Sequence, residues 1–91
     1  MTWRANADWG VELGCSPEAV DDMNRASVAF AADLRRAFAT DRTPIVINGV
    51  VGPRGDGYRV DRRMTIEEAR VYHGSQIEAF RDTDAVMWLC Q

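Results

Sequence analysis

The residues whose types could do chemistry follow a short segment rich in β-branched residues, residues 45–51. They form the run Gly52-Pro53-Arg54-Gly55-Asp56-Gly57-Tyr58, which combines a guanidinium and a carboxylate with three glycines. The planar guanidinium of Arg54 can bind the carboxylate of a substrate through two parallel hydrogen bonds. The alternative is that Arg54 and Asp56 pair with each other or with solvent, as exposed ion pairs commonly do. The run therefore indicates a ligand-binding loop without naming its ligand.

The remaining reactive side chains do not form a recognisable motif. Residues 52–58, called the glycine loop below, lack the GxGxxG spacing. The chain also has no lysine for a phosphate-binding loop, so a nucleotide site is not expected. His73, Cys15 and Cys90 are zinc-ligand types, but they lie far apart in the sequence and no fourth ligand is evident. No serine or cysteine sits in a nucleophile elbow. These residues by themselves do not indicate which reaction the protein catalyses.

Composition limits the classes of protein to which the chain can belong. Its 91 residues suffice for one domain at most. Eleven arginines against fourteen carboxylates give a net charge of −3 and no basic stripe, so a nucleic-acid partner is not expected. Two distant cysteines without CxxC spacing favour a reduced, cytoplasmic setting. No signal peptide is evident, and no apolar run approaches the ~20 residues that span a membrane.

Two helices are predicted on either side of the segment 45–51. The first begins at Pro17, with Ser16 as its cap, and an apolar stripe recurs every three or four residues at positions 20, 23, 27, 30, 34 and 38. The second begins after Thr65, which forms a capping box with Glu68. Residues 1–14 show no periodicity and are predicted to be a loop, whose two tryptophans need a surface to pack against.

Segment 45–51 is predicted to be a strand that is buried between two layers, because both of its faces are apolar. Segment 85–90 is predicted to be a second strand. A hairpin about Asn48-Gly49 is the alternative, although Gly52-Pro53 leaves its second arm very short. In the single-strand interpretation Asn48 points inward, and the glycine loop leaves the carboxyl end of the strand, where α/β folds bind ligands.

The resulting order is loop, helix, strand, helix, strand, with parallel strands, and it predicts an α/β fold. The strand-to-helix connection is long and the helix-to-strand links are short, as in α/β barrels. Two strands leave both edges of a sheet open, so we expect a piece of a larger domain, or self-association through those edges.

Three segments resemble the homocysteine S-methyltransferase family: residues 2–10, residues 50–58 with the Gly-Pro-Arg-Gly-Asp sequence, and residues 68–80. The resemblance implies a zinc-dependent (β/α)8 barrel that moves a methyl group from a methyl donor to the thiol of homocysteine. The whole chain, 1–91, would be a partial domain running from just after barrel strand two into barrel strand four. The resemblance does not identify the donor.

The same resemblance assigns roles to particular residues. The family's zinc thiolates have no counterpart here, because Cys15 and Cys90 match neither the later-strand cysteine nor the adjacent cysteine pair. We therefore expect no metal ligand, no catalytic residue and no activity of the chain alone. The alternatives are a non-catalytic module that completes a barrel by association, and a small-ligand-binding α/β module. The residues expected to shape the substrate pocket are Thr2, Trp3, Asn48, Gly52, Pro53, Arg54 and Asp56.

Overall fold

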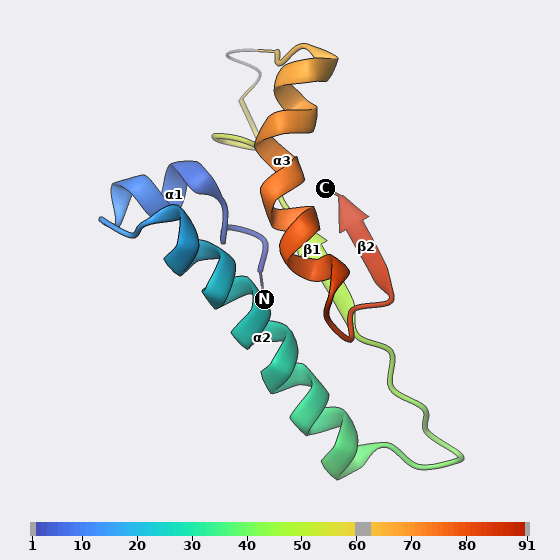
Figure 1. Ribbon diagram of the computed structural model, residues 1–91. Coiled ribbons are helices and arrows are strands. Elements are labelled where there is room, and N and C mark those ends of the chain that lie inside the picture. The colour runs from blue at the N-terminus through green and yellow to red at the C-terminus, as the bar shows by residue number, and fades with distance from the viewer. Residues whose placement is uncertain (1, 60–62, 91) are drawn as a thin grey trace.

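The computed structural model describes residues 2–59 and 63–90. Its elements follow one another as α1 (Ala7–Glu12), α2 (Pro17–Phe38), β1 (Asn48–Val51), α3 (Ile66–Arg81) and β2 (Met87–Cys90) (Figure 1). The molecule is elongated, with extents of 46 × 25 × 21 Å, because the lower half of α2 and the returning segment before β1 extend beyond the sheet.

Both predicted helix starts are confirmed. The Ser16 hydroxyl accepts a hydrogen bond from the backbone N–H of Ala19 at 3.1 Å, and Pro17 occupies the first turn of α2. At α3 the Thr65 hydroxyl accepts from the Glu68 N–H at 3.2 Å, and the Glu68 carboxylate accepts from the Thr65 N–H at 2.8 Å. These bonds satisfy N–H groups that have no partner within the helix, so each helix begins where its cap lies.

The prediction of a loop over residues 1–14 is wrong, because this segment contains helix α1. The Asn6 side chain caps the helix by accepting from the Trp9 N–H at 3.5 Å. A helix of six residues is too short to show the periodicity on which the prediction depended. Gly10 is buried against α2, where a Cβ atom would lie closer than 3.0 Å to the Val20 side chain.

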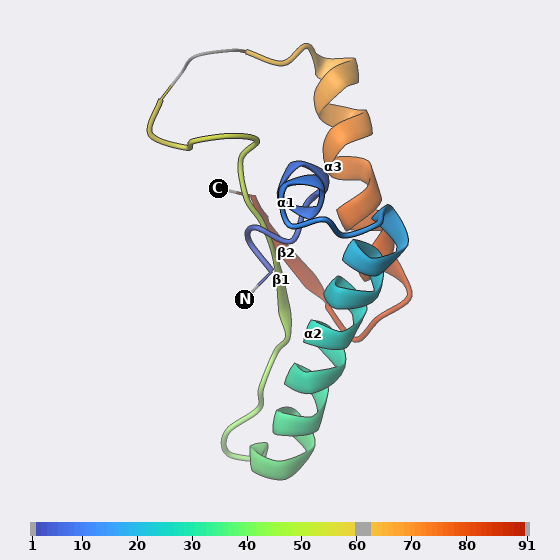
Figure 2. The same cartoon turned by 90° about the vertical axis from the view of Figure 1, so that its left-hand side faces the viewer.

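The two strands form a parallel pair in which Asn48 lies opposite Met87 and Val51 lies opposite Cys90. No hairpin forms about Asn48-Gly49, so the single-strand alternative is the one observed. Each strand is shorter than the predicted ranges 45–51 and 85–90, because the ladder covers only four residues. The chain comes from the link at residues 40–43 to one end of β1, and the glycine loop leaves the other end, as predicted (Figure 2).

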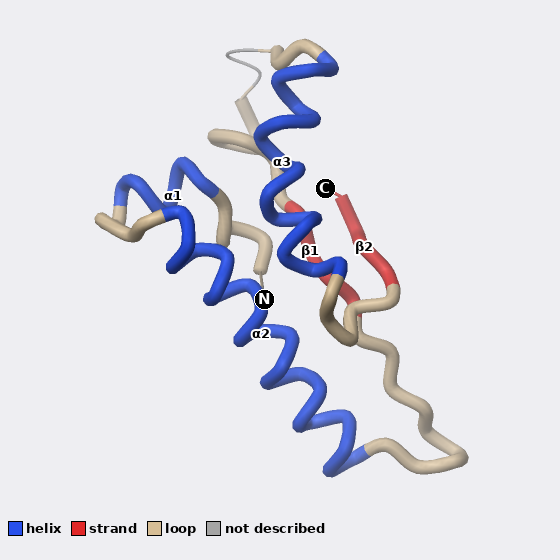
Figure 3. The backbone as a smooth tube through the Cα atoms, viewed as in Figure 1, coloured by secondary structure: helices blue, strands red, loops and turns tan. Residues whose placement is uncertain are grey.

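The prediction of an α/β fold belonging to a (β/α)8 barrel is wrong for the described residues. The structure is mostly helical: α2 and α3 have 22 and 16 residues, whereas each strand has four (Figure 3). A barrel wall requires several strands closed around an axis. Here one strand pair lies with both long helices on the same side of it (Figure 2). Helices, rather than strands, therefore make up most of the described structure.

The core lies where α2, α3 and β1 meet. Helix α2 does not bury its most apolar stripe: Phe30 and Phe38 are 66% and 69% exposed. Of that stripe only Val20, which lies against Gly10 of α1, is buried among the described residues. The other buried residues of α2 are smaller, are spaced four apart on a different face and lie toward α3 and β1; they are Asn24, Val28 and Ala32. The central cluster consists of Val28, Ala32, Ile47, Val51 and Phe80.

Candidate functional site

The N-terminal segment, residues 2–6, is hydrogen-bonded to β1 through Thr2. The buried Thr2 hydroxyl donates to the Val50 carbonyl at 2.9 Å and accepts from the Val50 N–H at 3.2 Å, as a neighbouring strand would. Buried side chains from both long helices hold the same segment. Gln76 donates to the Thr2 carbonyl at 2.7 Å, and Asn24 donates to the Ala5 carbonyl at 2.8 Å. Residues 2–6 therefore have a fixed position beside the end of β1.

Trp3 and Gly52, two of the predicted pocket residues, lie in direct contact. A Cβ atom on Gly52 would approach the Trp3 indole more closely than 3.0 Å and would lie 2.5 Å from the Trp3 carbonyl oxygen. Only glycine allows this approach, because a larger residue would displace either the indole or the backbone. Gly52 is buried and Pro53 is half-buried, so the glycine loop leaves β1 underneath the N-terminal segment.

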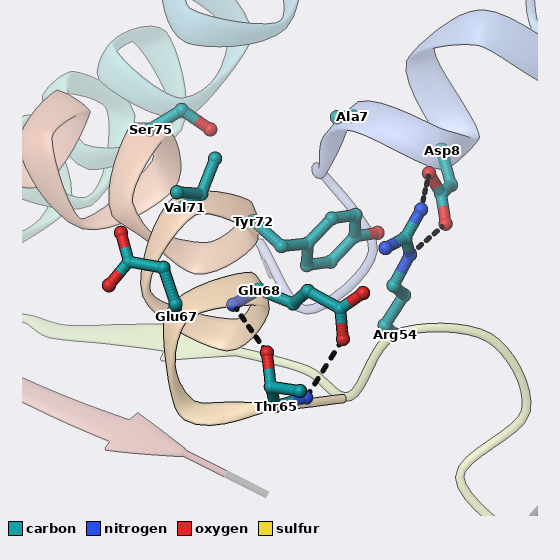
Figure 4. A pocket seen from close by; sticks show the side chains of 9 residues that line it. All are labelled: Ala7, Asp8, Arg54, Thr65, Glu67, Glu68, Val71, Tyr72 and Ser75. Atoms are coloured by element: carbon teal, nitrogen blue, oxygen red, sulfur yellow. Dashed lines mark hydrogen bonds and ion pairs between the residues drawn. The ribbon is translucent and has the colours of Figure 1, made fainter. Parts of the chain in front are cut away.

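Arg54, the predicted carboxylate ligand, binds a carboxylate of the protein itself. Its Nε donates to Asp8 Oδ2 at 2.9 Å and an Nη donates to Asp8 Oδ1 at 3.4 Å, giving a two-point ion pair (Figure 4). The guanidinium also lies over the Tyr72 ring, 4.5 Å from its centroid. The hydrogen bond to Asp8 raises the pKa of Arg54. Arg54 thereby joins α1 to α3 across the loop.

A pocket of about 690 Å³ opens beside this ion pair, between α1 and the first turns of α3 (Figure 4). The Tyr72 hydroxyl donates to Asn6 Oδ1 at 2.9 Å, which fixes the ring at the wall of the pocket. Burial raises the pKa of Tyr72, and burial lowers the pKa of the neighbouring His73. The lining residues are Ala7, Asp8, Arg54, Thr65, Glu67, Glu68, Val71, Tyr72 and Ser75.

Asp56 lines a second hollow, of about 500 Å³, together with Asp8 and Trp9 of α1. Asp56 does not pair with Arg54; its Oδ1 accepts from the Tyr58 backbone N–H at 2.9 Å. Arg4 lies at the same hollow, with its guanidinium carbon 4.7 Å from the Trp3 ring centroid and 5.0 Å from that of Trp9. The glycine loop therefore contributes one charged residue to each of two hollows.

Asn48 is separated from the predicted pocket residues of the glycine loop, although it shares a hollow with Thr2. Its side chain is exposed, and it lines a small hollow of about 130 Å³ together with Thr2, Ser27 and the neighbouring part of β1. Asn48 begins β1, whereas the glycine loop follows the end of the same strand. The structure thus brings Trp3, Gly52 and Arg54 to one region and leaves Asn48 at the other end of the strand.

Sequence reasoning did not identify Asp8, Tyr72 or Asn6 as members of the site. Asp8 lies 46 positions before Arg54, and Asn6 lies 66 positions before Tyr72, so no local spacing connects these pairs. Asn6 and Asp8 both fall in the segment 2–10 that carries the family resemblance. That segment indicated the region of the site but not the contacts within it.

The described residues do not fit a zinc ion of the kind the family uses. Among the side chains that the structure describes, within residues 2–59 and 63–86, no group of three or more His, Cys, Asp and Glu residues could hold a metal ion. Cys15 is half-buried with a free thiol, and the side chain of Cys90 lies outside the described part of the chain.

Two hollows whose volumes are in the range of small-molecule pockets thus lie beside the glycine loop, and the loop contributes one charged residue to each. The sequence model of the homocysteine S-methyltransferase family matches residues 1–91, and the chain belongs to that family. The predicted resemblance is therefore confirmed. Comparison with curated proteins found no match, and comparison with solved structures found none. Among the described residues, no helix is long and apolar enough to cross a membrane.

Proposed function

We propose that this chain shapes the substrate pocket of a homocysteine S-methyltransferase and does not transfer a methyl group on its own. The observation that carries the proposal is the contact of Arg54 with both Asp8 and Tyr72 beside the 690 Å³ pocket. Three segments distant in sequence meet there, and all of them belong to the part of the chain that matches the family. Homocysteine and a methyl donor are the corresponding substrates.

The expected lack of activity follows from the chemistry of the acceptor. The thiol of homocysteine must become a thiolate before it can attack a methyl group, and a zinc ion held by cysteines supplies that activation in the family. Here the two cysteines are at positions 15 and 90, and neither adjoins another cysteine. The free thiol of Cys15 is consistent with a reduced, cytoplasmic setting, which we include in the proposal.

The test is a methyl-transfer assay on the purified chain, with homocysteine as acceptor and either a sulfonium or a quaternary ammonium compound as donor. We expect no methionine above the protein-free control and less than one zinc ion per chain by metal analysis. Methionine formation that depends on the chain and is lost in the Cys15→Ser variant would contradict the proposal. The Arg25→Gln variant is a control, because Arg25 is exposed on α2 and forms its ion pair with Asp22, three residues away on the same helix.

We also propose that the chain associates with further protein, either a second copy or another polypeptide. Its accessible surface is 6878 Å², whereas a folded monomer of 10.2 kDa is expected to expose about 5,300 Å². The excess of about 1,600 Å² is larger than the roughly 800 Å² that each partner buries in a standard protein interface. Phe30, Phe38 and Val46 account for part of this surface. Sedimentation velocity tests the proposal: a single monomeric species at all concentrations, without added partner, would exclude self-association.

A further inference from the structure

Helix α2 has an apolar face that remains largely exposed. Its residues recur every three or four positions, so they lie within about a third of the helix circumference; they are Ala19, Met23, Ser27, Phe30, Leu34 and Phe38. We call this set the outer face of α2. Met23 and Leu34 are 48% and 44% exposed, and Phe30 and Phe38 are 66% and 69% exposed. By the same helical spacing, none of the charged residues of α2, a helix that the structure describes throughout, lies on this face.

The core of the described structure uses a different side of α2. Val28 and Ala32 pack there with residues of β1 and α3. The second half of α2 extends beyond α3 and the strand pair (Figure 1). The Ser27 hydroxyl, the one polar side-chain group of the outer face, donates to the Met23 carbonyl of the same helix at 2.8 Å. A partner can therefore cover the outer face without leaving a polar side chain unpaired.

The outer face is complementary to itself when two copies of α2 run antiparallel. If the helices cross between residues 28 and 29, residues at equal distances from that point lie opposite each other. Met23 of one copy then lies opposite Leu34 of the second copy. Phe30 lies opposite Ser27, and Phe38 lies opposite Ala19. Each phenylalanine thus meets a small side chain, which allows the two helices to pack closely.

The charged residues beside the outer face favour the same antiparallel arrangement. Asp22 pairs with Arg25 within the chain, and Asp33 pairs with Arg36. In the antiparallel arrangement Asp22 comes level, within one residue, with Arg36 of the second copy. Asp33 comes level in the same way with Arg25 of the second copy. A parallel arrangement would instead place each of these residues beside its own counterpart, and like charges would repel.

We infer that a second copy of the chain covers the outer face, with the two α2 helices packed antiparallel. The inference rests on the proposed association and deepens it by naming the surface and the partner. Each copy exposes about 1,600 Å² more than expected for its mass, which exceeds the roughly 800 Å² that each partner of a standard interface buries. Self-association is thereby assigned to a helix face, whereas the sequence predicted it through the edges of the sheet.

Sedimentation velocity of the full chain over a range of concentrations tests the apolar contacts. The Phe30→Asp variant places a carboxylate at the centre of the interface and should raise the dimer dissociation constant roughly tenfold or more. Because Phe30 is 66% exposed in the single chain, the variant should keep its fold, which far-UV circular dichroism and thermal unfolding check. Ile66→Asp is the matched control: Ile66 is 91% exposed on α3, and its replacement should leave the dissociation constant unchanged.

Charge reversal tests the antiparallel register. Asp22→Arg and Arg36→Asp should each raise the dissociation constant roughly threefold or more, because each places like charges level with each other across the interface. The double variant Asp22→Arg/Arg36→Asp restores opposite charges and should associate more tightly than either single variant. An equimolar mixture of the two single variants should likewise form a heterodimer more readily than either variant forms a homodimer.

A wild type that is monomeric at all concentrations overturns the inference, as does a Phe30→Asp variant that associates like the wild type. The inference also fails if Ile66→Asp weakens the dimer as much as Phe30→Asp does. A double charge variant without recovery contradicts the antiparallel register. A dimer that survives Phe30→Asp would keep the proposed association but exclude the outer face as its surface. Methyl transfer by the chain would contradict the proposed lack of activity without bearing on the dimer, so the two proposals can fail separately.

Discussion

Substitution of Gly52 by alanine tests whether the N-terminal segment is packed on the end of β1 as the structure describes. The new Cβ atom would come closer than 3.0 Å to the Trp3 indole and 2.5 Å from the Trp3 carbonyl oxygen. Ordinary contacts begin near 3.4 Å, so the indole and the backbone of Trp3 must both retreat. The backbone cannot retreat freely, because the adjacent Thr2 is hydrogen-bonded to both Val50 and Gln76.

Overpacking of a well-packed site costs about 1–3 kcal/mol of unfolding free energy. We expect Gly52→Ala to lie near the upper limit, about 3 kcal/mol, because one of the clashing atoms belongs to the backbone. For a domain of this size each kcal/mol corresponds to about 4–8 °C in Tm, so the variant should melt about 12–24 °C lower.

Gly74→Ala is the matched control. Gly74 lies within helix α3, and a Cβ atom there would have no neighbour within 4 Å. Alanine is a better helix former than glycine by about 0.5–1 kcal/mol, so this variant should be more stable than the wild type. The same chemical change at two glycines is thus expected to have opposite effects.

Thermal and urea unfolding, followed by circular dichroism and tryptophan fluorescence, measure both variants. A Trp3→Ala background completes the comparison: without the indole, Gly52→Ala should cost less, because only the contact with the carbonyl oxygen remains. If Gly52→Ala melts within about 2 °C of the wild type, the described contact between Trp3 and Gly52 is wrong.

Three further predictions concern polar side chains. Burial lowers the pKa of His73, so the folded state disfavours the charged imidazole. The free energy of unfolding should therefore be constant above pH ~6.5 and should fall as the pH decreases through the folded pKa. Urea unfolding at a series of pH values measures this, and the His73→Gln variant should lack the decrease. Gln76→Ala leaves the buried Thr2 carbonyl without its donor and should cost about 1–3 kcal/mol in urea unfolding; an unchanged midpoint would contradict the hydrogen bond. Tyr72→Phe removes the hydroxyl bound to Asn6 and should cost about 0.5–1.5 kcal/mol, and a Tyr72→Phe/Asn6→Ala double-mutant cycle that gives no coupling would refute the contact.

Local sequence predicted the beginnings of the long helices correctly. Ser16, Pro17, Thr65 and Glu68 act within one turn of the positions they cap, so their effect does not depend on what the helix later packs against. The family was also identified from the sequence, through segments such as Gly-Pro-Arg-Gly-Asp, and the family's sequence model matches residues 1–91.

Fold class and the buried face of α2 could not be obtained in this way. Hydrophobic periodicity favoured the stripe that contains Phe30, Leu34 and Phe38, yet the described chain buries the smaller Val28 and Ala32 against α3. Periodicity measures how apolar a helix face is, whereas burial depends on which face allows another helix to approach closely. Strand length likewise depended on how many residues find a pairing partner, and the described ladder extends over four.

The charged residues of the site show the same division. From sequence, Arg54 was predicted to be a cation in a glycine-rich loop at the carboxyl end of a strand. Its partners, Asp8 and Tyr72, lie on α1 and on α3, and only the packing of those helices brings them within hydrogen-bonding or stacking distance. The sequence determines the chemical type of each side chain. Its neighbours depend on contacts between distant segments, and these contacts form only when the chain folds.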